Sequence, residues 1–171
     1  VEAWQPGTQG GPAVADILFG EVNPGGKLPA SFPRGVGQLP LYYNHKSTGR
    51  PLDEKNKYSS KYLDVPVTPL YPFGYGLSYA SFKLSDLRLS ASSIPVDGSL
   101  TATVRVENTG RRLGDETVQL YIRDAVSSVT RPVRELKGFK RVPLKAGRGM
   151  DISFVLTPEY LGSQGVDGRF A

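Results

Sequence analysis

Several residue types are absent or rare in this sequence, and their absence excludes some kinds of site. The 171 residues include no cysteine, one methionine, one tryptophan and one histidine, His45. Without cysteine the chain can form neither a disulfide nor a thiolate metal site, and a single histidine excludes a metal site built from several histidines. No apolar stretch approaches the ~20 residues that a membrane helix needs. We therefore expect no metal, no cofactor and no membrane partner.

Charge is unevenly distributed along the chain, whose formal net charge is +5. The segment Arg131–Arg148 holds seven basic residues and a single acid, Glu135. A basic patch can attract nucleic acid. Here the basic residues alternate with apolar ones such as Leu136 and Val142, as on the solvent face of a strand pair. No nucleic-acid motif accompanies them, so we expect no nucleic-acid partner.

Residues 1–33 have the pattern of the end of an α/β unit. Apolar residues recur at helical spacing over 13–18, and Gly20 stands where a helix C-cap glycine belongs. A turn signal at 23–26 leads to the extended segment 27–32, whose Pro29 favours an edge or terminal strand. One helix and one strand cannot bury a core, so we expect this piece to need the rest of a domain upstream.

Residues 34–80 are rich in proline and tyrosine and show little periodicity. Loops of this length are uncommon inside compact proteins unless they are functional or disordered. Tyrosines supply burial that disordered segments lack. The sequence therefore predicts an ordered strap that lies over neighbouring domains. Its expected anchors are six tyrosines: Tyr42, Tyr43, Tyr58, Tyr62, Tyr71 and Tyr75.

Residues 81–171 alternate between apolar and polar side chains. The alternation is clear over 100–107, 118–123 and 152–156, and turn signals separate these runs. Short alternating strands without a long helix predict an antiparallel β-sandwich, and a fibronectin-III-like sandwich fits best. A turn at Asp167–Gly168 and the start of a strand at Arg169 are expected at the end of the sequence. Because a sandwich normally needs this further strand, we expect the sandwich to be truncated at its C-terminus.

Candidate sugar-contacting residues cluster early in the strap. Tyrosines can stack on sugar rings, while amide, imidazole and guanidinium groups can hydrogen-bond hydroxyls. This mixture identifies four candidate substrate-binding residues: Tyr43, Asn44, His45 and Arg50. The alternative is that Tyr42 and Tyr43 only pack between domains. We find no catalytic pair of carboxyl groups, although Asp64 stands in a partly apolar context beside Tyr62 and Leu63.

The run Pro69–Tyr79 resembles the signature that joins the last two domains of glycoside hydrolase family 3 enzymes. Further blocks resemble the same family in the expected order. These blocks are Ala3–Gly7, Ala15–Gly20, Asn23–Pro29, Ser31–Pro33, Tyr42–His45, Thr48–Pro51, Asn108–Gly110, Val118–Tyr121, Arg131–Val133 and Glu135–Phe139. Tyr42–His45 with Thr48–Pro51 is similar to the periplasmic β-glucosidase branch. The resemblance covers essentially the whole chain.

The resemblance implies a mainly β chain in three parts. Residues 1–33 would end an α/β-sandwich domain with its last helix and strand. Residues 34–80 would form the interdomain strap, and residues 81–171 a fibronectin-III-like domain. The catalytic nucleophile and the general acid/base would lie in upstream domains of the same enzyme, so no residue here inherits a catalytic role and the chain alone is expected to be inactive.

The parent protein implied by the resemblance is a retaining β-glucosidase, periplasmic or secreted, that hydrolyses terminal β-D-glucosyl residues of oligosaccharides. β-Xylosidase and N-acetylglucosaminidase activities stay open, and so does a homodimer. A rival interpretation is a stand-alone carbohydrate-binding or adhesive β-sandwich module. A further rival treats the sandwich as a spacer that only stabilises the enzyme.

Overall fold

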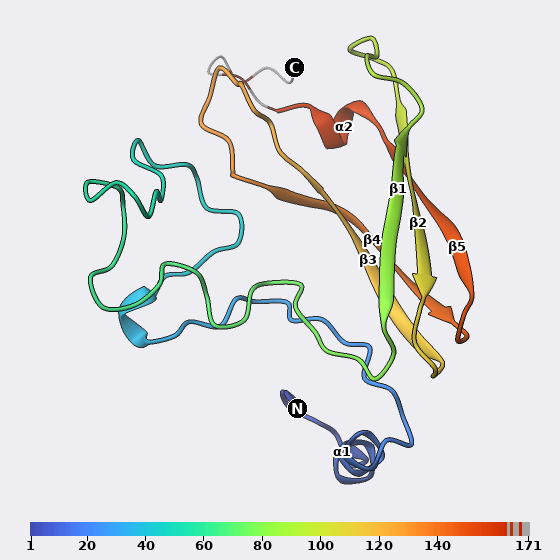
Figure 1. Cartoon of the computed structure of the whole chain (residues 1–171). Helices are drawn as coiled ribbons and strands as arrows, with labels where there is room; N and C mark the ends of the chain where they lie inside the picture. Colours follow the sequence, from blue (N-terminus) through green and yellow to red (C-terminus); the bar gives the residue numbers. More distant parts are fainter. Residues whose placement is uncertain (164, 166–167, 169–171) are drawn as a thin grey trace.

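The computed structural model describes residues 1–163, 165 and 168. A short helix near the N-terminus is followed by a long segment with little regular structure and then by two β-sheets that face each other (Figure 1). Asp167 of the expected turn Asp167–Gly168 and the strand expected from Arg169 lie outside the described residues. Within the described part, no helix is long and apolar enough to cross a membrane.

The strands form an antiparallel β-sandwich, which confirms the predicted fold class. One sheet has the strand order β1-β2-β5 and the other pairs β3 with β4. The bounds are β1 Phe82–Leu89, β2 Leu100–Asn108, β3 Gly114–Ile122, β4 Glu135–Leu144 and β5 Gly149–Leu156. A four-residue helix, α2 (Pro158–Leu161), follows β5. The three alternating runs of the sequence lie on β2, β3 and β5.

The core lies between the two sheets because alternate side chains of each strand point to the same face. Five apolar side chains from four strands are buried together: Val106, Val118, Val142, Leu144 and Ile152. Phe82, Val104 and Phe154 pack against them and are partly buried. The core is small and aliphatic, so polar groups at its end matter for stability.

Asn108, the last residue of β2, is fully buried at the end of this core. Its Nδ2 donates to the carbonyl oxygens of Arg112 and Leu144, each at 2.8 Å. Its Oδ1 accepts the backbone N–H of Gly110 at 2.9 Å. One amide side chain therefore satisfies the turn after β2 and the end of β4 together, in a place that water does not reach.

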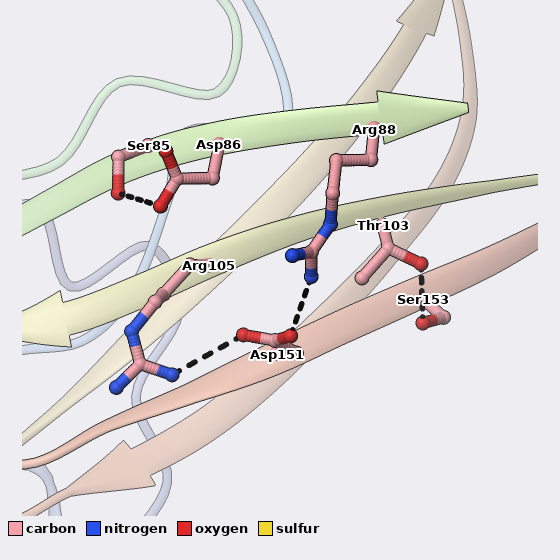
Figure 2. A network of polar contacts seen from close by, with 7 residues as sticks. All are labelled: Ser85, Asp86, Arg88, Thr103, Arg105, Asp151 and Ser153. Carbon is pink, nitrogen blue, oxygen red and sulfur yellow. Dashed lines mark hydrogen bonds and ion pairs between the residues drawn. The ribbon is translucent and has the colours of Figure 1, made fainter.

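The outer face of the three-stranded sheet carries a polar network (Figure 2). Asp151 lies between Arg88 and Arg105, with oxygen–nitrogen distances of 2.6 and 3.2 Å. Hydrogen bonds from these two arginines lower the pKa of the Asp151 carboxyl. Because all three side chains are exposed, the network contributes little to folding stability. It marks the solvent side of the sheet.

Helix α1 (Gly10–Phe19) ends at Gly20 in the left-handed conformation, with φ of 80°, as the sequence predicts. No residue of α1 is buried, and Leu18 and Phe19 are strongly exposed. The segment 27–32, predicted as an edge strand, forms no strand: it makes an isolated bridge between Phe32 and Tyr71 and separate backbone hydrogen bonds at Leu28. Pro29 and Pro33 remove backbone donors that a longer ladder would need.

The strap contains a single turn of 3-10 helix, η1 (Val36–Gln38). Gln38 is buried although it is polar, and its side chain closes the strap on itself. Its Oε1 accepts the backbone N–H of Arg34 at 2.5 Å, and its Nε2 donates to the carbonyl of Pro66 at 2.8 Å. This residue holds the two ends of the strap's loop together, and sequence reasoning did not single it out.

The six tyrosines expected to anchor the strap differ in burial within this chain. Their packing on neighbouring domains stays a prediction. Tyr43 is half-buried, whereas Tyr42, Tyr58 and Tyr62 are exposed. The part of the strap that carries Tyr58 and Tyr62 loops away from the sandwich (Figure 1), and both rings are exposed. Tyr71 and Tyr75 stack on each other with ring centroids 5.3 Å apart, but both stay partly exposed.

A tight junction connects the segment 23–32 to the segment 70–79, which run side by side in Figure 1. Leu28 N–H donates to the carbonyl of Tyr75, and Gly74 N–H donates to the carbonyl of Leu28. Oδ1 of Asn23 accepts the Tyr79 N–H at 2.7 Å. These contacts order the aromatic and glycine-rich run that opens the sandwich.

Both glycines of the run Phe73–Gly76 are required by this geometry. Gly74 has φ of 78°, which side chains rarely adopt, and its carbonyl accepts a hydrogen bond from Gln119 on β3. A Cβ on Gly76 would lie 2.2 Å from the carbonyl oxygen of Gly26. The two backbones therefore touch. A mostly buried ion pair between Lys27 and Glu116, 3.0 Å long, joins the same junction to β3.

The first prediction concerns the buried amide. Replacing Asn108 by alanine removes the donor to the carbonyls of Arg112 and Leu144, and leaves the Gly110 N–H only its longer hydrogen bond to the Ser81 carbonyl, at 3.3 Å. We expect the free energy of unfolding to fall by roughly 2–4 kcal/mol in urea titrations followed by circular dichroism. Arg111→Ala, in the exposed part of the same turn, is the control and should change it by less than about 0.5 kcal/mol. Equal effects of the two changes would contradict this role of Asn108.

The second prediction compares two facing glycines. Gly76→Ala places a methyl group against the Gly26 carbonyl, so the junction must shift. We expect a loss of about 1–3 kcal/mol in the same unfolding assay. Gly26→Ala is the matched control, because a Cβ there meets no atom within 4 Å. If Gly76→Ala were as stable as Gly26→Ala, the close approach would not constrain the junction.

Candidate functional site

A groove of about 220 Å³ opens where the strap lies against the start of β4. The strap contributes aromatic, imidazole and proline side chains, and the sandwich contributes a guanidinium group. The lining residues used below are Tyr42, Tyr43, His45, Pro69, Pro72 and Arg134. The groove therefore has walls from two parts of the chain that are far apart in sequence.

Tyr43 is the residue that holds the strap against the sandwich. Its ring stacks on Phe73 with a centroid distance of 4.1 Å and an angle of 13° between the ring planes. It meets the ring of Tyr121 edge-on at 6.0 Å. Its hydroxyl oxygen accepts the backbone N–H of Leu136 at 3.3 Å. One face of Tyr43 is thus covered by Phe73, which limits its use as a stacking platform.

Backbone pairing continues the contact beyond Tyr43. The carbonyl of His45 accepts the N–H of Val133 at 2.9 Å, and Lys46 forms an isolated bridge with Pro132. The His45 side chain is exposed, lines the groove and has its Nδ1 3.0 Å from the carbonyl oxygen of Lys46. Its other ring nitrogen stays available for a ligand.

The four candidate residues from the sequence do not form one cluster. Tyr43 and His45 both line the groove, whereas Asn44 and Arg50 do not. Asn44 is exposed. Arg50 is also exposed, and its carbonyl accepts the N–H of Ser60 within the outer loop of the strap. The four candidates are therefore divided between the groove and exposed parts of the strap outside it.

Two further residues of the groove, Tyr42 and Arg134, are not among the four candidates from the sequence. Tyr42 is 61% exposed within this chain. Arg134 lies in the basic segment that we interpreted as a solvated strand face, and its guanidinium carbon is 5.6 Å from the centroid of the Tyr121 ring. The pairing of residues 45–46 with 132–133, which the sequence does not reveal, brings Arg134 to the strap.

Cations dominate the electrostatics beside the groove. Glu135 is bound by Arg131 at 3.0 Å and by Lys137 at 2.8 Å. The hydrogen bond from Lys137, assisted by the charges of both cations, lowers the pKa of the Glu135 carboxyl. Burial raises the pKa of the Tyr121 hydroxyl, and the nearby charge of Arg134 opposes this rise. Glu135 therefore stays ionised and engaged, while Arg134 faces the groove.

Acid catalysis by a glycosidase requires a carboxyl group whose pKa is raised. Hydrogen bonds lower the pKa of the carboxyl groups of Glu135, Asp151 and Glu159, so none of these three suits that role. Asp64 is exposed, although the sequence places it beside apolar residues. Among the described residues, no group of three or more His, Cys, Asp or Glu side chains could hold a metal ion.

Comparison with protein families gives two matches in sequence order. Residues 1–79 match the glycosyl hydrolase family 3 C-terminal domain. Residues 116–170 match a fibronectin type III-like domain, which confirms the type of sandwich expected from the alternating strands. The first match includes the strap and the whole of the run Pro69–Tyr79.

Individual relatives agree with the family matches. The chain is 52% identical over 163 residues to a periplasmic β-glucosidase of Salmonella typhimurium, covering 94% of this chain and 21% of that protein. It is 47% identical over 156 residues to a β-xylosidase of Formosa agariphila, covering 91% of this chain and 21% of that protein. The chain thus spans about a fifth of the length of the curated relatives it matches.

Solved structures show the same correspondence in three dimensions. The crystal structure of a β-glucosidase from Listeria innocua in complex with glucose superposes with a TM-score of 0.92 at 43% identity. The match covers 99% of this chain and 24% of the Listeria chain. The resemblance inferred from the ordered sequence motifs is therefore confirmed, and the chain belongs to glycoside hydrolase family 3, as the C-terminal part of its enzymes.

Proposed function

We propose that this chain is the non-catalytic C-terminal part of a retaining β-glucosidase that hydrolyses terminal β-D-glucosyl residues. The observation that carries the proposal is the match of nearly the whole chain to a fifth of named β-glucosidases. The lowered pKa values of Glu135, Asp151 and Glu159 make these three carboxyl groups unsuited to acid catalysis, which supports an upstream reaction centre. A β-xylosidase among the relatives keeps xylosides as a second class of substrate to test.

In this proposal the chain assembles and stabilises the enzyme. Residues 1–33 complete an α/β domain, residues 34–80 form a strap, and residues 81–171 form the β-sandwich that supports both. The exposed Leu18 and Phe19 of α1 provide an apolar surface for the upstream part of the same protein. The junction around Gly76 then fixes the position of the sandwich relative to the α/β domain.

The proposed enzyme is periplasmic or secreted. The name of the Salmonella relative supports a periplasmic or secreted location. The partner of the chain is the upstream part of the same protein, and the substrate is a β-glucoside oligosaccharide. Whether two copies associate as a homodimer is decided by analytical ultracentrifugation.

The strap residues Tyr43, Asn44, His45 and Arg50 remain our candidates for contacts to the sugar substrate. Asn44, His45 and Arg50 are exposed and carry hydrogen-bonding groups. Tyr43 acts through packing, because it positions the strap by its contacts with Phe73 and Leu136. The exposed three are therefore the residues whose substitution separates substrate contact from folding.

The third prediction is that residues 1–171 alone do not hydrolyse 4-nitrophenyl β-D-glucoside. The longer protein that carries them should release nitrophenolate in the same assay, because the nucleophile and the acid/base lie in its upstream part. Turnover by the purified chain would show that the catalytic carboxyls are not all upstream. Loss of activity on removing only the sandwich, with unfolding of the remainder, would agree with the stabilising role.

The fourth prediction tests the exposed strap residues in the longer protein. His45→Ala and Arg50→Ala each remove a hydrogen bond to substrate and should raise KM by about three- to tenfold. Steady-state kinetics with a β-linked disaccharide measure this effect. Lys57→Ala is the control, since Lys57 is an exposed residue of the same strap whose ammonium lies over the ring of Tyr58. An unchanged KM in both variants would remove these residues from the candidate list.

A further inference from the structure

We propose that the groove between the strap and β4 binds a single sugar residue that carries a carboxylate, such as a glucuronic acid unit. Tyr42 would provide the stacking surface and Arg134 would pair with the carboxylate. The sugar part of this inference rests on the proposed function, whereas the anionic part rests on the charges of the groove alone.

Arg134 is placed to meet a ligand. It is exposed, it lines the groove, and its guanidinium is held over the ring of Tyr121 at 5.6 Å. In the described part of the chain it takes part in no ion pair. The adjacent Glu135 is engaged with Arg131 and Lys137 and does not neutralise it. A planar guanidinium in this state suits a carboxylate, which it can bind through two parallel hydrogen bonds.

The surroundings of Arg134 carry an excess of positive charge. Arg131 and Lys137 pair with one acid, Glu135, and the neighbouring Arg134 adds a further positive charge. No carboxylate is among the described residues that line the groove. An anionic ligand would therefore relieve repulsion among cations, while a neutral sugar would leave it unchanged.

The size and walls of the groove select one ring. Its volume of about 220 Å³ is below the ~300 Å³ at which pockets for drug-sized ligands begin. Tyr42 is free to stack, because it is 61% exposed, whereas Tyr43 already has a face covered by Phe73. Pro69 and Pro72 add apolar walls. An aromatic surface beside donors of hydrogen bonds is an arrangement that suits a pyranose ring.

Nucleic acid fits these observations less well. Binding to a phosphate backbone uses several free cations along a track. Further along the basic segment, Arg141 is paired with Asp115, and Lys140 donates to the carbonyl of Ser153. Arg134 lies next to an aromatic wall, which matches one charged sugar better than a polyanion.

The fifth prediction uses two probes that differ by one group. In a ligand-observed NMR titration of the full-length protein at low salt, methyl β-D-glucuronide should bind more tightly than methyl β-D-glucoside at the groove. Arg134→Gln should weaken the glucuronide by about tenfold or more and leave the glucoside unaffected. Tyr42→Ala should weaken the glucuronide as well. Arg148→Gln, an exposed arginine of the same basic segment away from the groove, is the matched control and should have no effect.

Further measurements keep the inference falsifiable. Arg134→Lys retains the charge but loses the planar pair of donors, so it should bind with intermediate affinity. Thermal unfolding of each variant checks that the fold is kept. Equal binding of both probes, or no response to Arg134→Gln in a folded protein, would overturn the proposal. Tighter binding of inorganic phosphate or of an oligonucleotide, with the same response to Arg134→Gln, would overturn the sugar and keep only an anion site.

The two proposals fail in different ways. Hydrolysis of 4-nitrophenyl β-D-glucoside by the same preparation reports on the proposed function and does not require the groove. An active enzyme that does not bind the glucuronide would overturn the groove proposal alone. A preparation that binds the glucuronide through Arg134 but hydrolyses neither a glucoside nor a xyloside would overturn the proposed function alone.

Discussion

The close approach of two backbones at Gly26 and Gly76 is the constraint on which the other parts of the structure depend. It fixes the segment after α1 beside the run that enters β1, and the hydrogen bonds of Leu28 and Asn23 follow from it. Because Gly74 in the same run contacts Gln119 of β3, the junction also sets where the sandwich lies. The strap begins and ends next to this junction. The position of the strap, and with it the position of the groove walls that the strap provides, therefore depends on the junction.

The features that could be predicted from the sequence are those set by local periodicity. The spacing of apolar residues in 13–18 and the alternation in β2, β3 and β5 depend on each element alone, and the structure agrees with them. The burial of the strap tyrosines could not be predicted in the same way, because the burial of a ring depends on the surface that faces it. Tyr43 finds such a surface in Phe73 and Tyr121, whereas Tyr58 is exposed within this chain.

The candidate site was only half accessible to sequence reasoning for a related physical reason. Tyr43 and His45 belong to a short motif whose side chains indicate sugar binding. Arg134, which lines the same groove, lies about ninety residues later, in a basic segment that the sequence indicated to be a solvated strand face. Only the backbone pairing of 45–46 with 132–133 brings the two together. Gln38 escaped notice because the value of a buried amide depends on the carbonyl that it reaches, here that of Pro66.

The contact of Tyr43 with Leu136 has a consequence for how the protein opens. This hydrogen bond and the one between His45 and Val133 close the strap against the sandwich by joining distant parts of the chain. Release of the strap from β4 therefore separates the two walls of the groove in one event. A molecule held by both walls would favour the closed form by mass action, so amide exchange at Val133 and Leu136 would slow as that molecule is added.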